Sequence, residues 1–304
     1  MSRMRPIALW LLLFAAQVRP GSVLGQELEP RAFSPAPVGT KFYFGGVGTL
    51  AGGYGLDPGA PISEVRATLR TLTLGGGYTF DLWGHQAQLL ALGPYVWGNV
   101  SGVAQGIEVG RSLHGFVDPR LRFSFGLHGA PSLSAEDFAR TPRKTVVGVS
   151  LTAILPFGEY DPERLANLGT HRWAFKPEIG VWHPIGHWTV EGSAGVWFFT
   201  PNDDFFPGGA TRTQDPLVSL QGHIVYSFQR GDWIAVDGTW YFGGQAEVDG
   251  NSSLGRMNNT RIGLTYSLPV GGGHSVKFSY SAGATTRSGA NFRTFNVLWQ
   301  LVTF

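Results

Sequence analysis

The feature that most constrains this chain is the alternation of apolar and polar residues along long segments. In the clearest case, residues 187–199, one set of alternate positions is mainly apolar and the other mainly polar. The apolar face carries Trp188, Val190, Ala194, Val196 and Phe198, and the opposite face carries Thr189, Glu191 and Ser193. A period of two is the side-chain period of a β-strand and does not fit a helix. The pattern predicts strands that separate an apolar environment from a polar one.

The same alternation recurs through the chain and predicts an all-β fold. Residues 275–285 repeat it, and so do residues 120–127. Twelve segments qualify as strands, an even number of the kind found in closed up-and-down sheets. They span approximately residues 40–51, 66–82, 85–99, 117–128, 143–155, 171–183, 187–199, 214–228, 232–244, 257–268, 274–285 and 292–302.

The connections between these strands alternate between tight and long. A barrel with one rim of short turns and one rim of long loops has this arrangement. Residues 129–142 break the rule, because they belong to the short-turn rim and contain a predicted helical turn with Ser132 or Ser134 as N-cap. The tight turns are 81–84, 183–186, 229–232 and 269–273, and the long loops are 52–65, 100–116, 156–170, 200–213, 245–256 and 286–291.

A soluble sandwich or propeller also has alternating strands, but other features favour a membrane barrel. The predicted strands reach twelve to fifteen residues, whereas about five or six is usual in soluble proteins. Only 14% of residues are charged, well below the roughly 25% of a typical soluble domain. Tryptophans gather near strand ends, as in the aromatic collars of membrane barrels. We therefore expect a transmembrane antiparallel up-and-down β-barrel of about twelve strands.

The N-terminal residues have the three-part layout of a secretory signal peptide. Two arginines precede an apolar run of ten residues, Ile7 to Ala16, and modest residues lead to Gly25. The run is about half the length of a membrane-spanning helix, and the alternative is an uncleaved anchoring helix. The sequence thus predicts a signal peptide over residues 1–25, a Pro-rich N-terminal periplasmic segment without a strand over 26–39, and the barrel over 40–304.

The last thirteen residues, FRTFNVLWQLVTF, predict the strand that closes the barrel against the first one. Phe295, Val297 and Trp299 would face lipid, and the polar residues between them would face inward. The terminal Phe304 resembles the C-terminal signature of bacterial outer-membrane barrels, which implies recognition by the barrel assembly machinery. Phe304 is out of phase with Trp299, which predicts either a bulge in the last three residues or a different strand phase.

Ionisable side chains are costly towards lipid, so those on the strands should face the lumen and pair with one another. We expect an ion pair between Asp237 and Arg261, and a pair of like charges, Glu178 and Glu191, that needs Lys176 or Arg172 nearby. The charges either pair as a structural plug or form a selectivity filter. The predicted lumen-facing residues are Arg120, Arg122, Arg172, Lys176, Glu178, Glu191, Asp237, Arg261 and Lys277, with aromatic contacts from Tyr43, Tyr95, Trp182 and Tyr241.

The residues give little sign of catalysis or of cofactor binding. The chain has no Cys, and its eight His residues are scattered, so we expect neither a metal site nor a cofactor. Ser219, His187 and His223 face inward by phase but form no recognised hydrolase motif, so we expect no catalytic residues and no enzyme. A net charge of +2 without a basic, aromatic-interleaved run argues against nucleic acid as a partner.

The stretch LPFGEYDPERLANLGTHRWAFKPEIGVW, residues 155–182, carries a family resemblance. Together with EPRAFSPAPVGTKF, FFTPNDDFF and SAGATTR, it resembles the outer-membrane family named after the MetA pathway of phenol degradation. The resemblance implies an outer-membrane barrel with a role in the passage of small, often aromatic, compounds. Within the stretch, Asp161 and Pro162 predict the start of a helical turn that ends at Gly169.

The expected function is a passive channel in the bacterial outer membrane for small hydrophobic or aromatic solutes, with outer-membrane lipids around it. The alternative is a plugged structural or surface-interaction barrel whose long loops meet partners.

Overall fold

The computed structural model describes residues 28–304, apart from residues 56–61, 105, 165, 207 and 287–288. The predicted signal peptide, residues 1–25, lies outside the described residues. Within them, none of the helices is both long and apolar enough to cross a bilayer.

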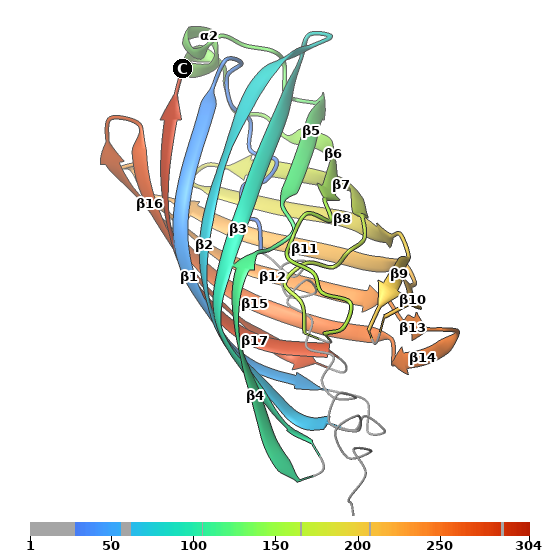
Figure 1. Ribbon diagram of the computed structural model, residues 1–304. Coiled ribbons are helices and arrows are strands. Elements are labelled where there is room, and N and C mark those ends of the chain that lie inside the picture. Colours follow the sequence, from blue (N-terminus) through green and yellow to red (C-terminus); the bar gives the residue numbers. More distant parts are fainter. Residues whose placement is uncertain (1–27, 56–61, 105, 165, 207, 287–288) are drawn as a thin grey trace, which may run out of the picture.

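Twelve long strands form one closed antiparallel barrel, which confirms the predicted all-β class (Figure 1). Neighbours in sequence are neighbours in the sheet, and β17 pairs with β1 to close it. All twelve correspond to predicted strands. They are β1 (Lys41–Gly55), β2 (Ile62–Leu82), β3 (His85–Ala104), β5 (Arg120–His128), β6 (Val146–Ile154), β7 (Ala174–Ile185), β8 (Trp188–Phe199), β11 (Leu217–Ser227), β12 (Trp233–Gly243), β15 (Met257–Gly271), β16 (His274–Thr286) and β17 (Gly289–Thr303).

The barrel wall has apolar side chains outside and charged side chains inside, the reverse of a soluble protein. Along β7, buried and exposed residues alternate from Ala174 to Trp182. The exposed positions are apolar, such as Ile179 at 50% exposure, whereas Lys176 and Glu178 between them are buried. An apolar outer face and a charged inner face are what a barrel in a bilayer requires, because only the lumen can solvate or pair charges.

The strands extend further at the long-loop end than the sequence predicts. The predicted loop over residues 100–116 is wrong: β3 continues to Ala104, and β4 (Ile107–Phe116) returns alongside it. β3 then pairs with β5 nearer the short-turn end. β4 and β5 together therefore form the antiparallel neighbour of β3 along its length. Much of the predicted loops 52–65 and 286–291 is likewise strand. Glycines at regular intervals weaken the strand signal in these segments.

Two further long loops pair with each other outside the barrel wall. The predicted loops 200–213 and 245–256 contain short strands that make a four-stranded sheet at the long-loop end (Figure 1). These strands are β9 (Asn202–Phe205), β10 (Ala210–Gln214), β13 (Ala246–Val248) and β14 (Asn251–Leu254). The pairing of β10 with β13 joins the two loops across the rim.

The short-turn end carries the predicted helical turn, which is α2 (Ala135–Arg140). Of the two predicted N-caps, the structure selects Ser134, whose hydroxyl accepts a hydrogen bond from the Asp137 amide at 3.1 Å. A bridge between His85 and Pro131 holds this segment against the turn between β2 and β3.

The closing strand has no bulge at its end. The pairing of β1 with β17 runs without a shift from Gly55–Gly289 to Lys41–Thr303. Phe304 lies beyond the last strand residue and is 76% exposed. Its mismatch with the phase of Trp299 therefore reflects its position past the strand.

Candidate functional site

The N-terminal residues of the described chain lie inside the barrel (Figure 1). The sequence predicts a periplasmic segment over residues 26–39 and does not decide whether it enters the lumen. The structure places residues 28–39 in the lumen, where they contact the inner faces of several strands. We call residues 28–40 the inner segment. As expected for its Pro-rich composition, it contains turns and no strand. This placement makes the segment part of the candidate site.

Glu29 of the inner segment sits among cationic side chains of the barrel wall. Its Oε2 accepts a hydrogen bond from Arg122 Nη1 at 2.6 Å, and its Oε1 lies 3.5 Å from Arg120 Nη1. Arg122 also donates to Glu178 at 3.1 Å, and Lys176 Nζ lies 2.9 Å from the other Glu178 oxygen. Lys176 is therefore the partner that the sequence predicts Glu178 to need. We call Glu29, Arg120, Arg122, Lys176 and Glu178 the charged belt.

The charged belt determines the ionisation of Glu29. Burial alone would raise the pKa of this carboxyl, but Arg122, Lys176 and Arg120 outweigh it and lower the pKa from 4.5 to about 2. The carboxylate is therefore charged at neutral pH and binds the wall as an anion.

A second polar group attaches the inner segment to the opposite strands. The Arg31 amide donates to Glu191 Oε2 at 2.7 Å, and the Arg31 guanidinium carbon lies 5.2 Å from the Trp233 ring centroid. The Glu29 amide donates to Gln221 at 3.4 Å. These contacts join the segment to β8, β11 and β12 as well as to β5 and β7.

The predicted ion pair between Asp237 and Arg261 is wrong. Asp237 instead lies 2.7 Å from His223 Nδ1 and accepts from the Thr265 hydroxyl at 2.8 Å. Arg261 donates to Ser281 at 2.9 Å. The register explains the difference, because Arg261 is paired with Thr239, two residues beyond Asp237 on β12.

The structure buries most of the predicted lumen-facing charges. Eight of the nine are between 2% and 7% exposed, although their neighbours on the same strands face outward, and Lys277 is half-buried. The charged belt contains four of the nine predicted residues. The eight buried residues are Arg120, Arg122, Arg172, Lys176, Glu178, Glu191, Asp237 and Arg261.

The aromatic predictions for the lumen are half right. Trp182 and Tyr241 are each 1% exposed and lie inside. Tyr43 is 48% exposed on the outer face, and Tyr95 packs edge-on against the outward-facing Phe116 with ring centroids 5.1 Å apart. The glycines on β1 obscure its phase in the sequence, which explains the error at Tyr43.

Phe33 of the inner segment occupies a seat on the wall between β6 and β7. A Cβ added to Gly180 would lie 2.2 Å from Phe33 Cε2, and one added to Gly148 would lie 2.9 Å from Cδ1. These two glycines are direct cross-strand partners, so they form one flat floor for the ring. Trp182, with Val146 and Ala130, forms a small core against which Phe33 packs.

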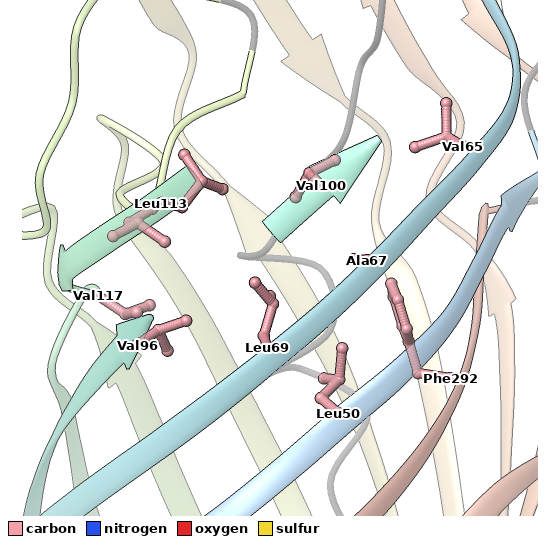
Figure 2. Close-up of a cluster of buried hydrophobic side chains, with 10 residues drawn as sticks. Leu50, Val65, Ala67, Leu69, Val96, Val100, Leu113, Val117 and Phe292 are labelled. Atoms are coloured by element: carbon pink, nitrogen blue, oxygen red, sulfur yellow. The ribbon is translucent and has the colours of Figure 1, made fainter. Parts of the chain in front are cut away.

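A larger apolar cluster lines the long-loop end of the lumen. Figure 2 shows its side chains projecting from β1, β2, β3, β4 and β17 towards one another. Leu168 packs into the cluster, so the loop over residues 156–170 folds back across the inner wall. The apolar lining comprises Leu50, Val65, Ala67, Leu69, Val96, Val100, Leu113, Val117, Leu168 and Phe292.

The loop over residues 156–170 is held by a buried carboxylate, not by the predicted helical turn. Asp118 accepts hydrogen bonds from the Gly158 amide at 2.9 Å, from the Thr170 amide at 2.8 Å and from the Thr170 hydroxyl at 2.6 Å. Asp161 makes a local turn and a salt bridge to Arg164 at 2.5 Å, but no helix follows. The predicted turn at Asp161 is present, but among the described residues of the loop it does not continue to Gly169.

Aromatic and cationic side chains share the facing wall. The Arg172 guanidinium carbon lies 4.4 Å from the Phe199 ring centroid, and Lys176 Nζ lies 5.4 Å from that of Trp197. Trp197 belongs to a core with Tyr241 and Leu217. The upper lumen therefore offers apolar surface on one side and aromatic surface with cations on the other.

Two small cavities lie beside the inner segment. One of about 30 Å³ lies next to Phe33 and Gln86, and one of about 10 Å³ lies between Glu29 and Glu191. At these two places the inner segment packs closely against the wall.

The residues considered for hydrolysis do not form a triad. Ser219 and His223 are buried on one strand, but His223 Nδ1 bonds to Asp237, and His187 is exposed at a turn, where it contacts the Ser227 carbonyl oxygen. In the part of the chain that the structure describes, no three acidic or His side chains converge to hold a metal ion.

A closed twelve-stranded barrel with an apolar outer face and a charged, filled lumen defines an outer-membrane β-barrel with a channel-like fold. The family described as "Putative MetA-pathway of phenol degradation" matches residues 42–297, and the chain belongs to it. This match confirms the resemblance carried by residues 155–182. A search of curated proteins finds no match.

Solved structures support the same fold. An outer-membrane channel from Pseudomonas putida F1 is 18% identical with a TM-score of 0.72, over 91% of this chain and 100% of that one. The transport unit of the autotransporter AIDA-I from Escherichia coli is 11% identical with a TM-score of 0.58, over 99% and 100% of the two chains. At these identities the similarity concerns the fold alone.

Proposed function

We propose that this protein is a passive channel for small hydrophobic or aromatic solutes across the bacterial outer membrane. The observation that carries the proposal is the lumen itself, in which the inner segment is held to the wall by ion pairs and apolar contacts between two apolar surfaces. The cluster around Leu69 and Phe292 lies above the charged belt, and the core of Trp182 and Val146 lies below it. A solute entering between the long loops meets apolar surface first, and the inner segment gates the lower half.

The same proposal covers the protein's surroundings and chemistry. Short turns face the periplasm and long loops face outward in barrels of this type. Lipid hydrocarbon covers the apolar outer face, no covalent step or cofactor takes part, and transport follows the concentration gradient. The barrel assembly machinery would read β17, whose terminal Phe304 projects from the strand.

The test is solute flux through refolded protein in liposomes. We expect toluene or phenol to equilibrate across protein-containing liposomes faster than across protein-free ones, after correction for passage through the lipid. Planar-bilayer recording should show small, flickering conductance, because the inner segment lies in the lumen. A Glu29→Gln, Phe33→Ala double variant should increase open time. If flux and conductance are absent in both proteins, the structural-barrel alternative replaces the channel.

A further inference from the structure

One arginine of the barrel wall binds two different groups of the inner segment. Arg122 Nη1 donates to the Glu29 carboxylate at 2.6 Å, and Arg122 Cζ lies 5.1 Å from the centroid of the Phe33 ring. A carboxylate and a phenyl ring, four residues apart in the chain, thus both contact one guanidinium. A small molecule that carries both groups could make the same two contacts.

The ring position is shaped for a planar group. Gly148 and Gly180 form the floor of the Phe33 seat, and any side chain at Gly180 would meet the ring at 2.2 Å. The guanidinium lies over the other face of the ring, where a cation attracts the π-electrons of an aromatic group. A puckered aliphatic ring loses the cation–π contact and fits a flat floor less closely.

The carboxylate position is shaped for an anion. Among the described residues, Arg122 and Lys176 share Glu178 as an acidic partner, and Glu29 supplies the second carboxylate beside them. Both cations are buried. If Glu29 leaves, the charged belt keeps three buried cations, Arg120, Arg122 and Lys176, and one carboxylate, Glu178, so an incoming anion restores the balance within the belt.

We propose that the lumen binds an aromatic monocarboxylate, with its carboxylate at the Glu29 position and its ring at the Phe33 position. The inner segment is then a built-in competitor, which the ligand displaces by taking over both contacts with Arg122. This inference rests on the proposed channel function and specifies a solute class for it. A neutral aromatic replaces only the ring, and a simple carboxylate replaces only the anion, so each displaces the segment less effectively.

The absence of cysteine from the chain allows a direct test on the whole protein. A spin label on Ser34→Cys, next to Phe33, reports movement of the inner segment in refolded protein. Phenylacetate should mobilise the label at a concentration at least about tenfold below that required for toluene or for acetate, because it replaces both anchoring contacts. Equal potency of the three probes, or no mobilisation by phenylacetate, would overturn the proposal.

Direct binding measurements separate competition from simple structural closure. Phenylacetate affinity, measured by calorimetry, should rise about tenfold in Glu29→Gln and in Phe33→Ala, because each weakens the competitor and raises the open population. Arg122→Lys, which keeps the charge but loses the two-sided geometry, should lower the affinity. Glu136→Gln on α2 and Phe157→Ala on an outer loop are matched controls at exposed positions and should have no effect.

Two outcomes distinguish this inference from the channel proposal. Phenylacetate binding without flux of any aromatic solute would support the binding site and refute the channel proposal. Flux of toluene, with phenylacetate affinity unchanged in Glu29→Gln, would leave the channel intact and refute the competitor site.

Discussion

At the scale of single residues, three glycines leave room on the inner wall for the groups that pack there, and two of them face the inner segment. Gly126, Gly148 and Gly180 are cross-strand partners on β5, β6 and β7 and form a row without side chains. Phe33 covers Gly148 and Gly180, and Ala130 covers Gly126. Phe33 and Ala130 occupy the space over these glycines. A side chain added to one of the glycines would therefore displace the group packed on it and leave the strand in place.

Replacing Gly180 by Val should therefore expel the Phe33 ring. The added Cβ would lie 2.2 Å from Phe33 Cε2, and such overpacking typically costs about 1–3 kcal/mol. We expect a lower Tm and longer channel openings in planar bilayers. Gly192→Val on β8 is the matched control, because the nearest neighbour of a Cβ added there is a carbonyl oxygen at 3.8 Å. An unchanged open time in Gly180→Val would mean that the Phe33 seat does not hold the gate.

At this scale, the sequence indicates which strand residues face inward but not which residues of the inner segment contact them. Strand phase alone assigned Lys176, Glu178 and Arg122 to the interior, because a charge on an alternating strand has only one low-energy side. The partners Glu29 and Phe33 were missed. They lie on a Pro-rich segment without periodicity, and nothing in such a segment indicates which strands it will touch.

At the scale of elements, the inner segment is anchored by buried hydrogen bonds at its C-terminal end. Near its end, the Pro37 carbonyl oxygen accepts from the hydroxyls of Thr40 and Thr79 at 2.7 and 2.6 Å, and all three residues are buried. Beyond Pro37 towards the N-terminus, the Glu29 and Phe33 side chains and the Arg31 and Ala36 amides hold the segment to the wall. In the gating that we propose, these contacts break while the bonds at Pro37 remain.

The ionisation of Glu29 should make this movement dependent on pH. Its pKa is about 2 when the segment is docked and near 4.5 when it is released, so docking is favoured fully above pH 4.5 and progressively less as the pH falls towards 2. The mobility of a spin label at Ser34→Cys should be constant from pH 8 to about 5 and rise below. Glu29→Gln should flatten this profile. A rise in label mobility centred near neutral pH would mean that a group other than Glu29 controls release of the inner segment.

The outer loop over residues 156–170 depends on Asp118 in a similar way. Asp118→Asn keeps the size but removes the charge that accepts three hydrogen bonds from Gly158 and Thr170. We expect a loss of about 1.5–3 kcal/mol of local stability, seen as faster trypsin cleavage at Arg164. Glu159→Gln, at an exposed position on the same loop, should change cleavage much less. Equal rates in the two variants would contradict the assigned role of Asp118.

Element-scale prediction was best where strands cross the bilayer. All twelve barrel strands follow from the period of two, because one side of each meets lipid and the other meets the lumen. The sequence does not predict β4 or the small outer sheet of β9, β10, β13 and β14. Outside the bilayer both faces of a strand can be polar or Gly-rich, and the alternation that reveals a strand is lost.

At the scale of the whole molecule, the apolar outer face implies that the cost of a charge depends on its depth. Ile179 is at the middle of β7 and faces outward, whereas Ile107 begins β4 in the part of the wall that extends beyond the long-loop rim (Figure 1). An arginine at mid-bilayer costs about 2–4 kcal/mol, and one outside the hydrocarbon costs close to nothing.

Ile179→Arg should therefore destabilise the barrel, and Ile107→Arg should not, although both residues are exposed. Reversible unfolding in lipid vesicles measures the difference, and retention of heat-modifiable gel mobility shows which variant still folds. In detergent micelles the difference in unfolding free energy between the two variants should be smaller, because a micelle deforms around a charge more easily than a bilayer does. Equal cost at the two positions in vesicles would mean that β7 does not cross the hydrocarbon and that the outer face has another partner.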